Sequence, residues 1–382
     1  MIHRIRVQNF KSIVDVTVEL SPVTVLVGRS GTGKSNFVEA IRLLRDVLPS
    51  QKAAQGLQKQ WAQCRPATNP KGPLRFEVQF SISGIDDRFK YDLALADQGP
   101  TRPPVEERLN IGKRCIFHQA IKDGRNPHKS QWIVKPEVLP APEPGPIALT
   151  RIPSITEVVI AFTALTSGIG CYLFSDNVLC RGEQSQGSTG LDDGATNHLG
   201  ALKEIVTDLH DLNVRKSIVA ALQRINPSVS SVELNDIQQP SHVVVGHKFN
   251  GKTLPLELPR ESAGFRRFYA HLLALYQRPS KQTLLFEHPE DAIHPGALSL
   301  LAEEFNAAPG DKRGQILLTT HSPKFLDHFG AAQIRVVELD GFQTRIGFIS
   351  DEQREAIHEK LLDAGELLTV DPARIQLEAT EA

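Results

Sequence analysis

A short stretch near the N-terminus carries the strongest chemical pattern in the chain. It runs from Gly28 to Ser35, reads GRSGTGKS, and matches the pattern G-x-x-x-x-G-K-[ST]. Glycines in such a stretch let backbone N–H groups curl around a phosphate, while Lys34 offers it a charge and the Ser35 hydroxyl suits Mg²⁺. An apolar strand precedes the stretch and an amphipathic helix follows it, so a phosphate-binding loop is predicted.

Three more polar groups follow or begin apolar segments in the last third of the chain. Glu287 ends the apolar run TLLFE, where a carboxylate suits a Mg²⁺-bound nucleotide. His321 follows the run ILLTT, a placement from which it would reach a terminal phosphate. The segment Ser262-Ala263-Gly264 opens a helix, whose N-terminus is a second potential anion site.

Strands and helices that would position these groups are readable from the periodicity. Alternating apolar residues predict strands at 3–10 and 14–20, and a continuous apolar run predicts a strand at 23–28. Apolar residues at helical spacing predict a helix over 34–48. Two further strands, 74–82 and 88–96, are predicted to form a hairpin. Residues 198–225 read as helical, and strands follow at 230–236 and 242–249. From residue 265 onward helices and strands alternate, which predicts an α/β fold with a mostly parallel sheet.

Residues 97–150 are rich in proline and glycine, and we expect an insertion or a set of long loops there. Its basic side chains outnumber its acids over residues 113–135, which leaves two interpretations open: a nucleic-acid contact, or a solvated hairpin or partner surface. The residues concerned are Lys113, Arg114, Lys122, Arg125, Lys129 and Lys135.

Composition narrows the class of protein. The 382 residues carry 43 basic and 44 acidic side chains, so the net charge of −1 indicates neither a nucleic-acid binder nor a membrane-surface protein. Four cysteines at no metal-ligand spacing favour a reducing cytoplasm. No signal-peptide pattern and no apolar run of membrane-spanning length is present, and the most apolar segment, residues 155–174, reads as buried elements of the fold.

The order and the residue patterns of these motifs resemble those of the SMC/RecF/OLD-type ABC ATPases. The family's N-terminal pattern is matched by residues 9–12, by 28–36 and by 39–41, and its weaker DGxNL stretch resembles residues 193–197. Its signature motif is similar to residues 262–264, its Walker B and D-loop to 287–295, and its switch to 320–323. The matches extend from residue 9 to residue 323, and only residues 97–180 have no counterpart.

The resemblance implies a two-lobed ATPase head in which two chains sandwich ATP and Mg²⁺, each signature meeting the phosphate loop of the other chain. Residues 1–96 would form an N-terminal lobe, 97–250 an inserted loop-rich and helical region, and 251–382 a C-terminal lobe, all within one head that also contains an antiparallel β subdomain. Ser35 and Glu287 would hold the metal, and Glu287, His288 and His321 would be catalytic. The nucleotide would contact Lys11, Gly28, Ser30, Gly31, Thr32, Gly33, Lys34, Ser35, Asn36, Ser262 and Gly264.

One departure from the family concerns hydrolysis. Members usually carry a glutamate after the Walker B acid, where this chain has His288. An imidazole accepts a proton near neutral pH, so His288 is either a replacement base or a poor one, and slow or partner-stimulated hydrolysis is expected.

At other positions the sequence leaves two interpretations open. Lys11 is a nucleotide contact or an ordinary strand-end lysine, His294 a catalytic group or a loop cap, and the 262–264 segment a signature or a helix cap. Gln79 is a weak candidate for the family's Q-loop glutamine, or a plain strand residue. The C-terminal tail, residues 352–368, reads as an amphipathic helix with Ile357, Leu361 and Leu362 on one side.

The leading hypothesis for function is an ATP-gated switch whose head dimer controls a separate effector, a role that the resemblance connects with anti-phage defence. The 61 residues after His321 lack the acid cluster of the nuclease domain that OLD proteins carry, so no cutting activity is expected of this chain. The alternatives are a RecF-like DNA-binding repair ATPase, a small-molecule kinase, and a nucleotide sensor that never hydrolyses.

Overall fold

The computed structural model describes most of the chain. The described residues are 1–49, 64, 72–95, 106–120, 131–134, 137–140, 147, 149, 155–175, 177–180, 190–207, 212–235 and 241–376. They group into two compact units. Unit 1 comprises Met1–Ile169, Ala332–Glu359 and Pro372–Ala382, and unit 2 comprises Gly170–Ala331 and Lys360–Asp371.

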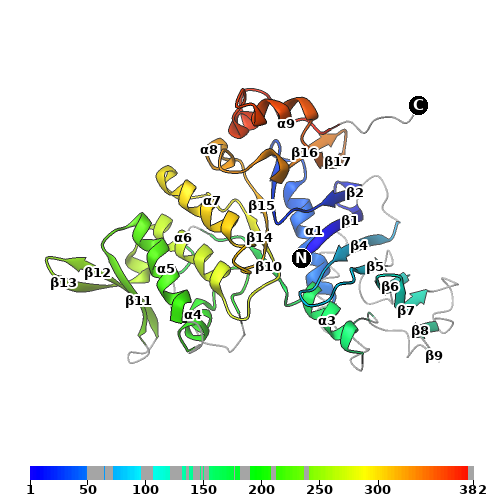
Figure 1. The fold of residues 1–382 in the computed structure, drawn as a ribbon, viewed down its shortest axis with the longest axis horizontal. Coiled ribbons are helices and arrows are strands. Elements are labelled where there is room, and N and C mark those ends of the chain that lie inside the picture. Colours follow the sequence, from blue (N-terminus) through cyan, green and yellow to red (C-terminus); the bar gives the residue numbers. More distant parts are fainter. Residues whose placement is uncertain are drawn as a thin grey trace. The chain divides into compact units, whose positions relative to one another are not determined.

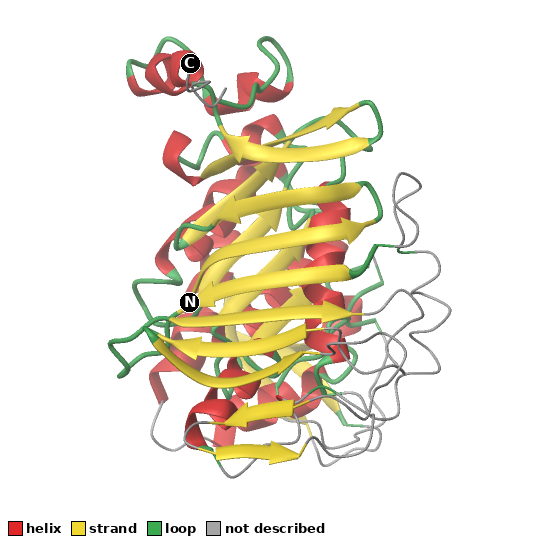
Figure 2. Cartoon of the chain, turned by 90° about the vertical axis from the view of Figure 1, so that its right-hand side faces the viewer, coloured by secondary structure: helices red, strands yellow, loops and turns green. Residues whose placement is uncertain are grey.

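Unit 1 contains an antiparallel sheet of eight strands in the order β2-β1-β4-β5-β6-β7-β8-β9 (Figure 2). The strands are β1 (Ile2–Phe10), β2 (Ile13–Glu19), β4 (Leu74–Phe80), β5 (Phe89–Leu95), β6 (Glu106–Ile111), β7 (Arg114–Ala120), β8 (Gln131–Val134) and β9 (Glu137–Pro140). Alternate side chains of β4, from Leu74 to Phe80, are buried while those between them are partly exposed, as expected for a sheet with one face on the core.

A second group of strands in unit 1 surrounds the phosphate loop. β3 (Val23–Val27) is buried at every residue and pairs in parallel with β16 (Ile334–Asp340), which in turn pairs antiparallel with β17 (Gln343–Phe348). α1 (Lys34–Val47) follows β3 and buries Phe37, Ile41 and Leu44 at helical spacing. The unit also holds α3 (Thr156–Leu165) and α9 (Asp351–His358).

Unit 2 combines a parallel strand pair, a helical layer and a small sheet. β14 (Thr283–Glu287) pairs in parallel with β15 (Gln315–Thr319), and β10 (Ile169–Tyr172) lies on the other side of β14. α4 (His198–Thr207), α5 (Leu212–Ile225) and α6 (Ala263–Tyr276) pack on one another near the antiparallel strands β11 (Val229–Asn235), β12 (His242–Phe249) and β13 (Lys252–Glu257) (Figure 1). α7 (Leu298–Ala307) and the short α8 (Pro323–Leu326) complete the unit, and short 3-10 turns connect the elements.

The mixed α/β class and the parallel strand pairs predicted from the alternation are confirmed. The prediction of loops over 97–150 is wrong for the residues that the structure describes there, because β6 to β9 extend the antiparallel sheet. β6, with the sequence EERLNI, carries Glu107 on its buried side, and this buried carboxylate interrupts the apolar alternation. The helical stretch 198–225 is two helices, α4 and α5.

The C-terminal tail also differs from the prediction. α9 ends at His358, and Lys360 then adopts a left-handed backbone (φ 59°) that no helix continues through. Asp363 and Glu366 form a capping box that starts a new 3-10 turn over Ala364–Leu368. The expected apolar stripe therefore does not form, and the Leu361 side chain is 75% exposed.

The three predicted segments, 1–96, 97–250 and 251–382, do not coincide with the two units. β16 and β17 belong to unit 1 because β16 pairs with β3 and β17 pairs with β16, and the predicted insert is divided at Ile169. Within the described part of the chain, no helix is both long enough and apolar enough to cross a membrane.

Candidate functional site

The phosphate loop of unit 1 lies between β3 and α1. Gly28 and Gly33 have positive φ angles of 154° and 105°. A Cβ on Gly28 would lie 2.1 Å from the carbonyl oxygen of Val337, so the position accepts no side chain. α1 begins directly after the loop without a side-chain cap, which leaves the N–H groups of its first turn available to an anion.

Lys34 is folded back onto its own loop. Its buried ammonium donates hydrogen bonds to the carbonyl oxygens of Gly28 (2.7 Å) and Arg29 (2.9 Å). Burial lowers the pKa of Lys34 to about 8. Ser35, one position further, is exposed at the start of α1.

Lys11 and Asn36 contact other parts of unit 1. Lys11 pairs with Glu39 of α1, and its backbone is left-handed (φ 49°) at the turn between β1 and β2. The Asn36 amide donates a hydrogen bond to the Ser12 hydroxyl in that same turn (2.7 Å). Both predicted nucleotide contacts therefore hold the turn and α1 together in this structure.

The segment resembling a signature motif begins α6 in unit 2. Ser262 is exposed and caps the helix by accepting a hydrogen bond from the backbone N–H of Phe265 (3.2 Å). A Cβ on Gly264 would lie 2.8 Å from the carbonyl oxygen of Ala292, so this glycine permits close packing on the D-loop segment. The preceding Glu261 accepts a hydrogen bond from His247 of β12 (2.6 Å).

The two parallel strands β14 and β15 bring their predicted catalytic residues to one edge. Glu287 is paired in register with Thr319, and its side chain is 7% exposed. His288 follows with a left-handed backbone (φ 47°), and its N–H donates to the carbonyl oxygen of Thr319 (3.2 Å). The imidazole rings of His288 and His321 stack nearly parallel, with centroids 4.8 Å apart.

A buried carboxylate that sequence reasoning missed holds the switch segment. Glu290 Oε1 accepts hydrogen bonds from the Thr320 hydroxyl (2.7 Å) and from the backbone N–H of His321 (2.9 Å). The side chain is 9% exposed. Glu290 thus connects the segment after β14 to the segment after β15. In the sequence, the sign of this contact is that both segments directly follow apolar strands.

Arg267 of α6 is a second residue that the sequence did not single out. Its buried guanidinium donates a hydrogen bond to the carbonyl oxygen of His288 (3.1 Å) and lies 3.7 Å from the Asp291 carboxylate. The helix that begins with the signature-like segment is therefore connected to the residues that follow β14.

Three further residues from the predicted motifs have structural contacts. His294 Nδ1 accepts the backbone N–H of Gly296 (3.1 Å), so this side chain is a loop cap here. Gln79 is a strand residue of β4 paired with Lys90. In the DGxNL-like stretch, the buried Asn197 bonds to the backbone of Asp192 and Gly190, which is a structural role.

The predicted metal ligands belong to different units, Ser35 to unit 1 and Glu287 to unit 2. Among the described residues, no group of three or more His, Cys, Asp or Glu side chains is arranged to hold a metal ion by itself. A Mg²⁺ ion that takes most of its ligands from phosphate and water needs only one or two protein oxygens. The Ser35 hydroxyl and the Glu287 carboxylate are each an oxygen ligand of the kind that such an ion takes from a protein.

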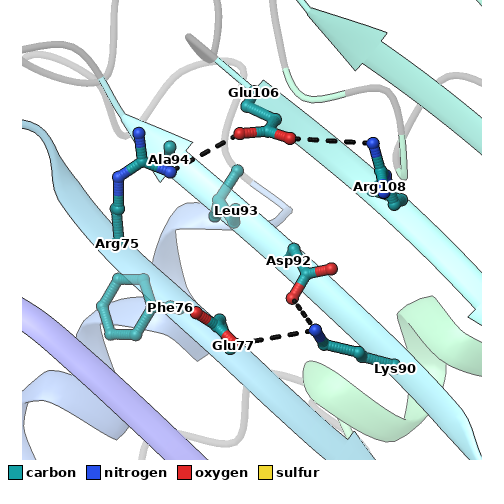
Figure 3. A pocket seen from close by; sticks show the side chains of 9 residues that line it. All are labelled: Arg75, Phe76, Glu77, Lys90, Asp92, Leu93, Ala94, Glu106 and Arg108. Atoms are coloured by element: carbon teal, nitrogen blue, oxygen red, sulfur yellow. Dashed lines mark hydrogen bonds and ion pairs between the residues drawn. The ribbon is translucent and has the colours of Figure 1, made fainter. Parts of the chain in front are cut away.

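A pocket on the sheet of unit 1 is lined by none of the predicted site residues. It is formed over β4, β5 and β6, where Lys90 pairs with Glu77 and Asp92, and Glu106 pairs with Arg75 and Arg108 (Figure 3). Because its charged groups pair with one another, the pocket shows no excess of either charge.

The basic stretch is only partly described. Lys113 is exposed, and Arg114 pairs with Glu157 of α3 (2.8 Å). The other four basic residues, Lys122, Arg125, Lys129 and Lys135, lie outside the described residues.

Two family models match separate parts of the chain. A model described as "AAA ATPase domain" matches residues 1–134, and a model described as "AAA domain, putative AbiEii toxin, Type IV TA system" matches residues 175–327. The first covers the phosphate loop, and the second covers the signature-like segment, Glu287 and His321.

Individual proteins are similar as well. An OLD nuclease from Thermus scotoductus is 41% identical over 135 residues, which cover 32% of this chain and 26% of that protein. The match thus spans about a quarter of the relative's length. A structure of an SmcHead bound to the C-winged helix domain of ScpA has 12% identity and a TM-score of 0.55, covering 92% of this chain and 99% of that one.

A structure of the Smc head domain with an extended coiled coil, bound to the C-terminal domain of ScpA derived from Pyrococcus furiosus, has 13% identity and a TM-score of 0.53. It covers 94% of this chain and 99% of that chain. At such identities the two structures show a common fold.

Proposed function

We propose that this chain, which is an SMC/OLD-type ABC-like ATPase, works as an ATP-gated switch. Two heads would associate head to tail around ATP, and hydrolysis or a partner would release them. The observation that carries this proposal is the exposed Ser262 at the N-terminus of α6. An exposed signature-like helix end, joined by Arg267 to the residues after β14, suits contact with the phosphate loop of a second head.

The phosphate loop would bind the nucleotide through its backbone. Its glycines and the uncapped first turn of α1 present N–H groups, and Lys34 would exchange the carbonyls of Gly28 and Arg29 for the β and γ phosphates. Bound Mg²⁺ would supply charge neutralisation at the phosphates, with Ser35 and Glu287 as its protein ligands. Ser30, Gly31 and Thr32 would complete the cradle.

Glu287, His288 and His321 would perform the chemistry at the carboxyl edge of β14 and β15. His321 is exposed after β15, and Glu290 holds its backbone N–H, so the ring would be presented to a terminal phosphate. His288 stands where a water-polarising base is expected, and its ring is stacked on His321. We propose slow or partner-stimulated hydrolysis, because His288 replaces the glutamate that usually polarises the attacking water.

The effector is proposed to be a separate protein. The OLD relative is a nuclease by name, and one matching family model is described by a toxin and a toxin–antitoxin system. These names support a defence module in which the head controls a damaging activity. Both neighbouring SMC head structures contain a bound partner domain, which also supports a partner for this chain.

A complementation experiment tests the head-to-tail dimer. Lys34→Ala removes the ammonium that would contact the phosphates, and Ser262→Arg obstructs the signature-like helix end. Each variant alone should lose most ATP hydrolysis. An equimolar mixture should recover about a quarter of wild-type activity, because half of the dimers are mixed and each mixed dimer holds one intact site of two. No recovery, in mixtures shown by light scattering to contain dimers, contradicts the shared site.

A sensor that binds ATP without hydrolysing it is the second candidate. The left-handed backbone of His288 favours it, because glutamate, the usual base, is strained in that conformation whereas histidine and asparagine are tolerated. ATP binding and dimerisation with no phosphate release in single-turnover assays would support the sensor over the hydrolase.

A further inference from the structure

Thr344 of β17 contacts the phosphate loop from behind. Its side chain is 2% exposed. Its hydroxyl donates a hydrogen bond to the carbonyl oxygen of Thr32 (2.8 Å) and lies 2.6 Å from the Ser12 hydroxyl. Its backbone N–H donates to the carbonyl oxygen of Ser12 (2.8 Å). One residue therefore joins the loop to the β1–β2 turn from a strand about 310 residues further along the chain.

The hydrogen bonds around Thr344 form a directed chain. Asn36 donates to the Ser12 hydroxyl, and the Thr344 hydroxyl donates to the Thr32 carbonyl. Because each hydroxyl has one hydrogen, the Ser12 hydroxyl must donate to Thr344. Every hydroxyl then donates once and accepts once, and the chain ends on a backbone carbonyl of the loop. Such chains strengthen each member by polarisation.

The shape of the loop depends on the same side chain. A Cβ on Gly33 would lie 2.0 Å from the Thr344 hydroxyl and 3.0 Å from that of Ser12. The space that any other residue at position 33 would need is thus filled by Thr344. On the neighbouring strand, the Val337 carbonyl fills the space beside Gly28. The β16–β17 hairpin thereby shapes the loop at two of its glycines.

The bond to Thr32 orients a peptide group that nucleotide binding would use. The peptide is planar and trans, so its C=O and N–H point in opposite directions. With the Thr32 oxygen directed toward Thr344, the Gly33 N–H points away from the hairpin. The geometry assigns Thr344 as a positioning residue for the phosphate loop, whose hydroxyl sets the Thr32–Gly33 peptide and thereby the affinity for a nucleoside triphosphate.

This inference rests on the proposed binding of ATP in the loop, and three variants test it. Thr344→Val is nearly isosteric but lacks the hydroxyl, which leaves the Thr32 carbonyl and the Ser12 hydroxyl without this partner. Thr344→Ser keeps the hydroxyl. Ile346→Val, two residues along the same strand and also buried, removes a methyl group but no hydrogen-bonding group and serves as the stability control.

Affinity for a non-hydrolysable ATP analogue is measured by fluorescence titration, together with the thermal midpoint without nucleotide. Thr344→Val should weaken binding about tenfold, and Thr344→Ser less than about threefold. Ile346→Val should lower the midpoint and leave the affinity unchanged. Equal affinities for wild type and Thr344→Val, or equal weakening by Ile346→Val, overturn the positioning role.

Hydrogen exchange without nucleotide separates this inference from the proposed switch. Peptides spanning residues 28–37 should exchange faster in Thr344→Val than in wild type or Ile346→Val, whether or not ATP binds. Unchanged exchange in Thr344→Val overturns the positioning role. A wild-type chain that binds ATP but does not dimerise contradicts the switch and leaves the role of Thr344 supported by exchange and affinity.

Discussion

The phosphate loop in unit 1 and the carboxyl edge of β14 and β15 in unit 2 are held by different kinds of interaction. Glycines and neutral hydroxyls join the loop to the rest of unit 1, with Thr344 at the centre, and Lys34 adds a charged contact within the loop itself. Charged groups hold the edge, where Glu290 bonds to the switch segment and Arg267 to the His288 carbonyl. The first region is thus organised mainly by shape and the second by charge. Replacing a charged side chain with a neutral one of the same shape should therefore disturb the structure of the second region far more.

The largest expected effect is at the strand-end carboxylate. Glu287→Gln keeps the shape and removes the charge that would hold Mg²⁺, so ATP hydrolysis should fall about a hundredfold or more. ATP affinity measured with a chelator should stay as in wild type, whereas the gain in affinity on adding Mg²⁺ should disappear. Loss of affinity in the chelator would break the comparison, because the loop would then depend on this charge.

Glu290 should give the next largest effect. Glu290→Ala leaves the Thr320 hydroxyl and the His321 N–H without their acceptor, which should cost about 2 kcal/mol of unfolding free energy. Hydrolysis should fall about tenfold through misplacement of His321. Glu290→Gln keeps one acceptor oxygen. It should therefore lose less unfolding free energy, measured by urea unfolding, and less hydrolysis, measured by phosphate release. Equal losses for Ala and Gln would contradict the positioning of His321.

The pH dependence of ATP affinity examines the buried charge of the loop, the Lys34 ammonium. The pKa of Lys34 is about 8 in the folded chain against 10.5 for a free lysine. Above pH 8 the amine of the folded chain becomes neutral, so binding that needs the ammonium must take up a proton. Affinity should be constant below pH 8 and then fall up to about tenfold per pH unit.

Lys34→Arg supplies the control for that titration, because a guanidinium stays charged over this range. Its affinity, although weaker at pH 7, should change little up to pH 9.5. A wild-type affinity that is flat between pH 7 and 9.5 would show that the charge of Lys34 is not what the nucleotide recognises. The protein's own stability should rise with pH between about 8 and 10.5, since the unfolded chain then binds the extra proton.

The smallest effect is expected at His288. His288→Asn keeps the left-handed backbone at φ 47° and removes the ring that can take a proton, so it should lower steady-state hydrolysis about threefold to tenfold if the ring is a base. His288→Glu restores a carboxylate at some cost in backbone strain. A rise in hydrolysis with Glu and no change with Asn would identify the wild-type chain as a sensor.

Much of the fold was predictable because its signals are local. Alternating or continuous apolar residues identified β1 to β5, and helical spacing identified α1 and α6. The strand β6 escaped because Glu107 lies on its buried side, where it accepts a hydrogen bond from the Tyr91 hydroxyl and interrupts the apolar alternation. Likewise Asp363 and Glu366 end the expected tail helix through a cap that periodicity does not register.

For the candidate site, the sequence by itself determined the phosphate loop, because the pattern from Gly28 to Ser35 reports a backbone conformation that neighbouring residues impose. It also placed Glu287 and His321 at the ends of apolar strands. Only the tertiary structure decided what holds these groups. Thr344, Glu290 and Arg267 act through contacts between residues distant in sequence. Such a contact is specified by strand register and helix packing, and no local pattern records which distant side chain will fill the space beside a glycine.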